Sequence, residues 1–314
     1  MLVDAALLVG GIALLTVAAE RFVIGASRLA VLLRVSPVVV GVVIIGFGTS
    51  SPEVLAAGLA ALQRQPEVAV GTIVGSNIAN LTLILGVAAL ARPIVVTSKT
   101  IEREAPLSAI AVGMFAIALQ GRLGRGVGLL LLLGLAWGLW MVLRAAAPDE
   151  ELARETDEFV RVSEPHRRGV EAIRTVLGLG GTILGAQLLL VGATGLAESL
   201  GIAGGFAGFT IVALGTSLPE LVTALQAARH GEPDLIVGNL LGSNLFNSLA
   251  VAATVILVRP GPLDAPTLTG IGTLVMVGVA AAGWLMMATA RKVVRWEAVV
   301  LIVAYLAILP LLYA

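Results

Sequence analysis

The sequence predicts an all-α integral membrane protein with ten transmembrane helices, arranged as two inverted five-helix repeats with interrupted helices. Three observations predict this class. Of the 314 residues, 58% are hydrophobic and 13% are charged, with a mean hydropathy of +1.01. Apolar runs repeatedly exceed the roughly 20 residues that span a bilayer. Two long segments of the first half return in the second half, and each contains a proline and a glutamate inside an apolar run.

Charged or Gly/Pro punctuation separates the apolar runs into candidate helices. They are 4–33, 37–62, 67–91, 106–120, 126–144, 172–199, 204–229, 234–258, 265–289 and 294–313. Between the fifth and sixth lies a strongly charged stretch with almost no apolar periodicity, which indicates a solvated linker. We therefore expect a first repeat at 1–144, a linker at 145–171 and a second repeat at 172–314.

The repeat is ungapped over its landmarks. GVVIIGFGTSSPE at 41–53 returns as GFTIVALGTSLPE at 208–220, and GTIVGSNIAN at 71–80 returns as GNLLGSNLFN at 238–247, both at an offset of 167 residues. Because five spans separate equivalent positions, the second repeat must cross the membrane in the opposite sense. Inverted repeats with interrupted helices are typical of alternating-access transporters.

Most lysines and arginines fall on the side of the central linker when the chain is threaded through ten spans. Only Arg64, Arg122, Arg125 and Arg259 fall on the other side. Because cytoplasmic loops are enriched in these residues, we expect a multi-pass protein of the cell (plasma or inner) membrane, with both termini outside and a cytoplasmic linker. The N-terminus lacks a basic segment typical of a signal peptide, and is expected to be a retained first helix.

Composition also excludes several classes of protein. The chain has no cysteine, which excludes disulfides and thiolate metal sites, and its formal net charge is zero with scattered basic residues, which argues against a nucleic-acid partner. An intramembrane hydrolase is disfavoured because no membrane-embedded histidine or lysine offers a base for Ser50 or Ser217. His166 and His230 lie in polar segments and are expected at the surface. No enzymatic activity and no cofactor are predicted.

The two prolines explain the interruptions. Pro52 has no amide hydrogen, so it leaves the carbonyl of Gly48 without its helical donor, and Pro219 does the same to Gly215. Glu53 and Glu220 follow directly, in the first turn of a restarting helix. An ionisable side chain near the bilayer centre is costly, and it marks a functional site with a partner.

The other residues of these motifs also carry oxygen or amide groups. They are the hydroxyls of Thr49, Ser50, Thr216, Ser217, Ser76 and Ser243 and the amides of Asn80 and Asn247. Such hard ligands suit Ca²⁺, with Na⁺ as a second ion, and suit zinc or copper poorly.

Nearby residues have simpler interpretations. Asn77 and Asn244 fit either hydrogen bonds between helices or ion contact, and Gly71, Gly75, Gly238 and Gly242 fit close helix packing. Glu102, Glu104 and the linker acids are expected in loops. Asp4, Glu20, Glu198 and Glu297, nearer the helix ends, are expected to be interfacial or paired.

GTSSPE with GSNIAN, and GTSLPE with GSNLFN, resemble the paired alpha-repeats of the sodium/calcium exchangers in the cation/calcium antiporter superfamily. The resemblance covers the ten-helix body. It implies that Glu53 and Glu220 are the central Ca²⁺ ligands and that helices one and six form a sliding gate. It also implies that Na⁺ or Ca²⁺ is bound by Ser50, Ser217, Ser76, Ser243, Asn80, Thr49 and Thr216 and by the carbonyls of Gly46 and Ala213. Many prokaryotic relatives and the potassium-dependent branch have Asp where this chain has Asn247, which argues against potassium dependence.

The sequence therefore favours a secondary antiporter that exchanges Ca²⁺ for Na⁺ across the lipid bilayer by alternating access. A Ca²⁺/H⁺ antiporter that uses the same two glutamates stays open as the alternative, and a passive cation channel comes third. The sequence leaves the oligomeric state open, a monomer included.

Overall fold

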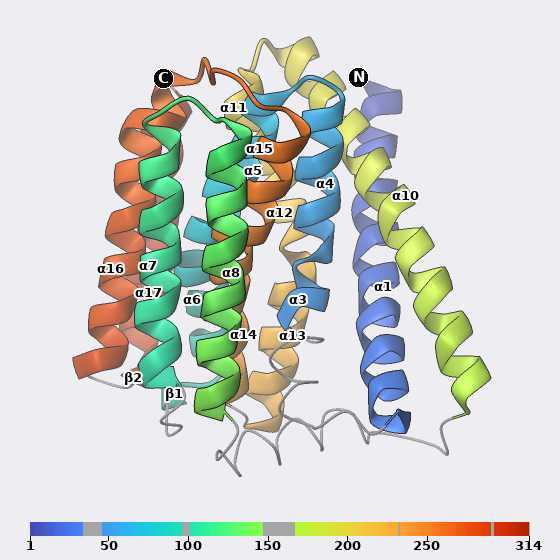
Figure 1. Cartoon of the computed structure of the whole chain (residues 1–314), viewed down its shortest axis with the longest axis vertical. Coiled ribbons are helices and arrows are strands. Elements are labelled where there is room, and N and C mark those ends of the chain that lie inside the picture. Colours follow the sequence, from blue (N-terminus) through green and yellow to red (C-terminus); the bar gives the residue numbers. More distant parts are fainter. Residues whose placement is uncertain (34–45, 96–100, 147–166, 232, 290–291, 314) are drawn as a thin grey trace.

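The computed structural model describes residues 1–33, 46–95, 101–146, 167–231, 233–289 and 292–313 (Figure 1). This part of the chain is almost entirely helical. Six of its helices are long and apolar enough to span a membrane, and a seventh span is formed if the bent pair Gly204–Thr216 and Leu218–Arg229 counts as one. Shorter apolar helices lie at Ser51–Leu62, Glu104–Leu119 and Arg125–Met141. The chain is a multi-pass membrane protein.

The elements of the first half follow the candidate helices. They are α1 (Leu2–Leu32), α3 (Gly46–Thr49), α4 (Ser51–Leu62), α5 (Pro66–Ala79), η2 (Asn80–Ile84), α6 (Leu85–Ala91), β1 (Ile94–Val95), α7 (Ile101–Leu119) and α8 (Arg125–Ala146). Here η denotes a π-helical segment. The candidate helix 37–62 starts among residues outside the described ranges.

The second half begins with α10 (Arg168–Leu200), α11 (Gly204–Ala207), η3 (Gly208–Val212), α12 (Ala213–Thr216) and α13 (Leu218–His230). It continues with α14 (Pro233–Phe246), η4 (Asn247–Val251), α15 (Ala252–Val258), η5 (Leu268–Gly272), α16 (Thr273–Thr289), β2 (Lys292–Val293) and α17 (Arg295–Tyr313). Prolines stand in the first turn of α4, α5, α13 and α14, where a missing amide hydrogen costs no helical bond. Gly201 and Gly231 end α10 and α13 in the left-handed conformation, which glycine adopts without strain.

Two faces of the bundle serve as references. We call the face where α8 ends and α10 begins the linker face, and the opposite face, where α1 begins and α17 ends, the terminal face (Figure 1). The most buried of the long apolar spans are Pro66–Ala91, which comprises α5, η2 and α6, and Pro233–Val258, which comprises α14, η4 and α15. They lie between α7, α8, α16 and α17 on one side and the pair α1 and α10 on the other.

Helices α1 and α10 pack against each other along most of their length at one edge of the bundle (Figure 1). Glycines allow their backbones to approach closely. A Cβ atom at Gly11 would meet the backbone of Leu189, and one at Gly185 would meet the backbone of Leu15. Gly178 and Gly192 are in the same situation. Small residues of this kind allow membrane helices to pack tightly, so α1 and α10 form one paired unit.

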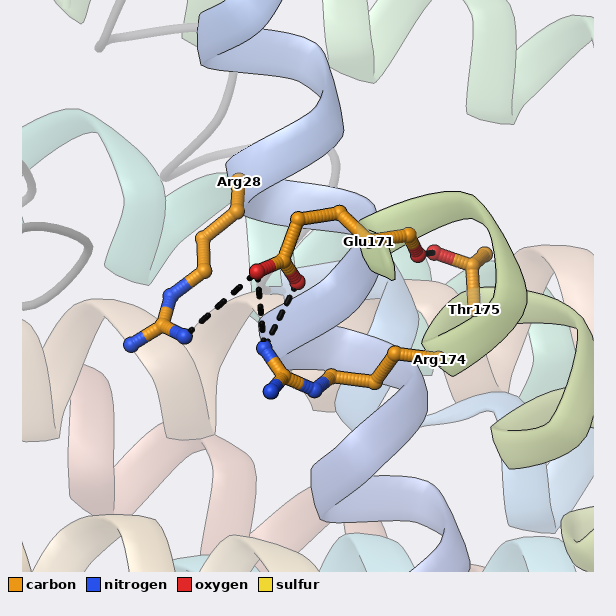
Figure 2. Close-up of polar contacts among 4 residues, drawn as sticks. All are labelled: Arg28, Glu171, Arg174 and Thr175. Carbon is orange, nitrogen blue, oxygen red and sulfur yellow. Dashed lines mark hydrogen bonds and ion pairs between the residues drawn. The ribbon is translucent and has the colours of Figure 1, made fainter. Parts of the chain in front are cut away.

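At the linker face, this pair is joined by charge. Glu171 of α10 accepts two hydrogen bonds from Nη1 of Arg174, at 2.7 and 2.9 Å, and its Oε1 lies 3.7 Å from Nη1 of Arg28 on α1 (Figure 2). The carbonyl of Glu171 also accepts a hydrogen bond from Thr175. The expectation that Glu171 belongs to a solvated linker is wrong, because α10 begins at Arg168 and buries this carboxylate against α1.

Further differences from the expected organisation concern short elements. Glu104, expected in a loop, is buried within α7, which begins at Ile101. The strands β1 and β2 pair antiparallel, with Ile94 opposite Val293, and a second backbone bridge joins Leu123 to Gly261. Two-residue strands have no periodicity that a sequence pattern could reveal. These bridges connect the two halves at opposite faces of the bundle.

Candidate functional site

The helices break where the prolines predict. Ser50 separates α3 from α4, and Ser217 separates α12 from α13, where the two segments meet at a bend of 43°. Glu53 and Glu220 lie in the first turns of α4 and α13, both with no exposed surface. The N-terminal dipole of each restarting helix favours a negative charge at that place.

Each glutamate is held by a serine from the other half. Ser217 donates a hydrogen bond to Oε1 of Glu53 at 2.8 Å, and Ser50 donates a longer one, at 3.5 Å, to Oε1 of Glu220. The two pairs occupy equivalent positions of the repeat. The two helix breaks therefore face each other, and the two carboxylates lie in one site.

The serines of the next helices complete this cluster. Ser243 of α14 donates to Oε1 of Glu220 at 3.3 Å, and Ser217 also contacts Oγ of Ser76 on α5 at 3.1 Å. Both serines are fully buried. The second carboxylate oxygen, Oε2, of each glutamate is buried without a hydrogen-bond partner in the described structure. A buried carboxylate oxygen in that situation is costly unless a ligand satisfies it.

The asparagines differ between the halves. Asn80 donates to Oδ1 of Asn244 at 2.9 Å, while its own Oδ1 has no partner among the described residues. The equivalent residue, Asn247, is fully buried, and neither Oδ1 nor Nδ2 has a partner there. Each of these asparagines begins a π-helical segment, η2 or η4, and single π turns often mark functional sites.

Thr49, Thr216, Gly46 and Ala213 surround the breaks. Thr49 is buried and donates to Oδ1 of Asn239 at 3.2 Å. The carbonyl of Ala213 accepts from Thr216 and from the amide of Ser217, so an ion at this carbonyl would compete with the Thr216 hydroxyl. Gly46 is the first residue of α3.

The freed carbonyl of Gly48 has a donor that the sequence reasoning missed. Ser51, one residue after the break, donates to it at 2.7 Å. The equivalent position of the second half is Leu218, which has no donor to offer Gly215. A serine directly before a proline was a visible signal, because short hydroxyl side chains commonly bond to nearby carbonyls.

Two other residues join the site without having been predicted. Asn239 contacts Thr49, and Ser248 accepts a hydrogen bond from Asn77 at 2.9 Å. Asn239 lies within the repeated GNLLGSN segment, so its position could have suggested it. Asn77 and Asn244, for which two interpretations were open, both bond between helices, since Asn244 donates to the carbonyl of Asn77.

The glycines of these motifs differ in how closely they pack against neighbouring helices. Gly71 and Gly75 of α5 pack against backbone of the α11–η3 segment, since a Cβ at either would meet the carbonyl of Gly205 or Phe209. The packing role expected for Gly242 is wrong, because a Cβ there would meet nothing within 4 Å.

Chemically, the site is a buried cluster of oxygen donors with two carboxylates. Across the described residues no group of three or more His, Cys, Asp or Glu side chains could hold a metal ion. A cation here would be bound by two carboxylates together with neutral oxygens. Hard cations such as Ca²⁺ accept such a set, with six to eight oxygens.

Comparison with known proteins identifies the class. The family profile "Sodium/calcium exchanger protein" matches residues 3–144 and 171–314. CaxA of Alkalimonas amylolytica is 37% identical over 322 residues, with complete coverage of both chains, and the inner membrane protein YrbG of Escherichia coli K12 is 37% identical over 271 residues, covering 84% of this chain and 82% of its own.

Solved structures of the sodium-calcium exchanger NCX_Mj are similar over nearly the whole chain. One, soaked with Na⁺ and Sr²⁺, superposes with a TM-score of 0.71 at 27% identity, covering 98% of each chain. The helical bundle and its buried carboxylate site therefore belong to a membrane cation transporter. The chain is a member of the sodium/calcium exchanger family and a cation/Ca²⁺ antiporter.

Proposed function

We propose that this chain exchanges Ca²⁺ for Na⁺ across the cell membrane, by alternating access to one site that contains Glu53 and Glu220. The observation that carries the proposal is the crosswise pairing of the two glutamates. Each is fully buried, each has one oxygen bonded to a serine of the other half, and each has a second oxygen without a partner among the described residues. The exchanger NCX_Mj, similar in structure, carries sodium and calcium in its name.

The proposed ion ligands are the predicted set. It comprises Glu53, Glu220, Asn80, Asn247, Ser50, Ser217, Thr49, Thr216, Ser76, Ser243 and the carbonyls of Gly46 and Ala213. Two ionised glutamates balance one Ca²⁺, so the calcium-loaded site is close to neutral. When Na⁺ replaces Ca²⁺, it binds to the same oxygens. Because the two ions compete for one site, the transport of one is coupled to the transport of the other.

The architecture that fits this function is a ten-helix bundle of two inverted repeats joined by a cytoplasmic linker, with the bounds expected at 145–171 narrowed to the residues between α8, which ends at Ala146, and α10, which begins at Arg168. Both termini then lie outside. The described spans, the repeat offset and the distribution of arginines support this arrangement. Alternating access would follow from movement of the α1–α10 pair across the site.

The decisive experiment compares driving gradients. Purified protein is reconstituted into proteoliposomes. Uptake of ⁴⁵Ca²⁺ is then measured in separate samples under an outward gradient of Na⁺, of H⁺ or of K⁺. Uptake driven by Na⁺ alone supports the proposal. Uptake driven by H⁺ alone establishes the proton-coupled alternative, and Ca²⁺ entry without any second gradient establishes a channel.

Charge movement gives an independent test. Exchange of three Na⁺, the number that the family resemblance implies, for one Ca²⁺ moves one net positive charge, worth about 2.3 kcal/mol per 100 mV. An inside-positive potential should accelerate Ca²⁺ uptake into Na⁺-loaded vesicles, with no need for K⁺ on the sodium side. Uptake that ignores a valinomycin-clamped potential contradicts this stoichiometry while leaving the exchange itself intact.

The orientation has its own test. Because the chain has no cysteine, a single Glu155→Cys variant reports only the linker. An impermeant thiol reagent should label it from the cytoplasmic side alone. Labelling of intact cells from outside would reverse the proposed topology.

A further inference from the structure

A small cavity lies beside the candidate site, on the side of the linker face. Its volume is about 30 Å³, and it lies between α1, α3 and α13, with Thr49 and Pro219 among its lining residues. Pro219 directly precedes Glu220. Gln226 also lines it, about two turns further along α13, so the lining residues of this helix span roughly 10 Å toward its end at His230.

Glu20 of α1 lines the same cavity, beside Thr16 and opposite Thr223 and Gln226 of α13. It is exposed, and it lies about 18 Å along the helix from Leu32, where α1 ends. A carboxylate at this depth would be costly if it faced lipid. An interfacial or paired role was expected for Glu20, but no ion pair among the described residues includes it. Its place in the cavity indicates contact with water instead.

The equivalent positions toward the terminal face have a different chemistry. At the 167-residue offset, Glu20 corresponds to Gln187, and Thr223 and Gln226 correspond to Ala56 and Leu59. Gln187 accepts a hydrogen bond from Gln63 at 3.1 Å. Ala56 is fully buried, and α4 and α10 pack against each other there. The carboxylate of Glu20 and most of the polar lining of the cavity therefore occur only on the linker side.

We infer that Glu20 recruits cations at the entrance on the linker side, and so sets the apparent affinity for Ca²⁺ from that side alone. It positions the ion before it reaches the central site and is not one of the central ligands. A single carboxylate in a narrow cavity with low-dielectric walls raises the local cation concentration about tenfold or more, and a divalent ion gains most. This inference rests on the proposed cation exchange at Glu53 and Glu220.

The test measures the two faces separately. Exchange is assayed with the Glu20→Gln variant in right-side-out and inverted vesicles, with sidedness verified by a cysteine at position 155. The KM for Ca²⁺ presented at the linker face should rise about three- to tenfold, while the KM at the terminal face and the maximal rate stay within about twofold. Raising the ionic strength with choline chloride should shrink the difference between parent and variant, because salt screens exposed charges.

Two further variants make the result specific. Glu198→Gln removes an exposed carboxylate near the terminal end of α10, outside the cavity lining, and should leave the linker-face KM unchanged. Gln187→Glu places a carboxylate at the equivalent position on the terminal side and should lower the terminal-face KM. If Glu20→Gln does not fold, Glu20→Asp and Gln187→Glu still test the idea: Glu20→Asp must keep the linker-face KM, and Gln187→Glu must change only the terminal face.

Equal effects at both faces, or none, would overturn the recruitment role. An equal effect would mean that Glu20 acts on the central site itself. Absence of Na⁺-driven uptake by the parent chain is a different result, because it overturns the proposed exchange. If the parent chain exchanges but Glu20→Gln changes the KM equally at both faces or at neither, only the proposed role of Glu20 is overturned.

Discussion

The two helix breaks have nearly the same sequence, yet their polar groups have different hydrogen-bond partners in the structure. At the first break, Ser51 bonds to the carbonyl of Gly48, and at the second, Leu218 offers no such donor. Asn80 donates to Asn244, whereas its counterpart Asn247 has both amide atoms without a partner in the described structure. Among the described residues, Asn247 thus keeps one more unsatisfied amide atom than Asn80, and we expect an ion to gain more from Asn247.

The ends of the α1–α10 pair differ in the same way. At the linker face, Glu171 is buried between Arg28 and Arg174 (Figure 2). At the repeat offset Glu171 corresponds to Asp4, which at the terminal face pairs only with the exposed N-terminal amine, at 2.7 Å, in the described structure. A pair fixed more firmly at one end is expected to separate or tilt more easily at the other.

The largest effect should come from the two glutamates, where the halves act alike. Glu53→Gln and Glu220→Gln each remove half of the formal negative charge and preserve shape and an acceptor oxygen for the serine. Each variant should reduce Na⁺-driven ⁴⁵Ca²⁺ uptake about a hundredfold or more. The reason is that a buried cation loses one of its two negatively charged partners, and the preserved shape of the side chain does not replace that charge.

Glu198→Gln serves as the matched control, because Glu198 is exposed near the terminal end of α10. It should exchange at the parent rate. Transport near that rate by either central variant would refute the placement of the ion between the two breaks.

The charged end of the α1–α10 pair should affect stability next. Glu171→Gln leaves Arg28 and Arg174 close together without their shared carboxylate, and we expect a loss of about 2 kcal/mol, moderated because both arginines are partly exposed. Asp4→Asn should cost well under 1 kcal/mol, as exposed pairs do. Thermal unfolding in detergent measures both, and equal shifts would remove the proposed difference between the two ends.

Sequence reasoning predicted the two helix breaks but not the contacts between them. Proline and glutamate within apolar runs predicted both breaks, because a missing amide hydrogen acts locally. The crosswise bonds from Ser217 to Glu53 and from Ser50 to Glu220 depend on how distant helices pack, which no local pattern encodes.

The charges were misjudged for a related reason. Glu171 stands among many charged residues, and the average polarity of that stretch concealed one side chain that α10 turns inward. The π-helical turns at Asn80 and Asn247 likewise depend on tertiary packing. The assignment of the twelve predicted ligands to Ca²⁺ or Na⁺ stays a prediction.

The two asparagines should separate affinity from stability. Asn247→Ala removes an amide that the described protein does not bond, so we expect the KM for Ca²⁺ to rise about tenfold, near 1.4 kcal/mol, with little change in Tm. Asn80→Ala breaks the bond to Asn244 and should lower stability by about 1 kcal/mol as well. A variant at position 247 that lowers Tm more than one at position 80 would reverse the comparison.

The smallest effect should come from the one donor that distinguishes the breaks. Ser51→Ala leaves the Gly48 carbonyl without its hydroxyl partner, which makes the first break resemble the second. The carbonyl then becomes available to an ion at the cost of the lost bond, about 1 kcal/mol of stability. We expect Na⁺ to use this neutral oxygen, so the half-saturating Na⁺ concentration should fall about two- to threefold while the KM for Ca²⁺ changes less.

Leu218→Ser is the reciprocal change, and it should make the second break resemble the first. A hydroxyl at this position can donate to the Gly215 carbonyl, as Ser51 does to Gly48, and would withdraw that oxygen from an ion. The half-saturating Na⁺ concentration should therefore rise about two- to threefold, a change equivalent to the net strength of one hydrogen bond or less. If Ser51→Ala and Leu218→Ser shift the Na⁺ dependence in the same direction, the carbonyls freed by the two prolines do not contact the ion, and the difference between the breaks is one of helix stability alone.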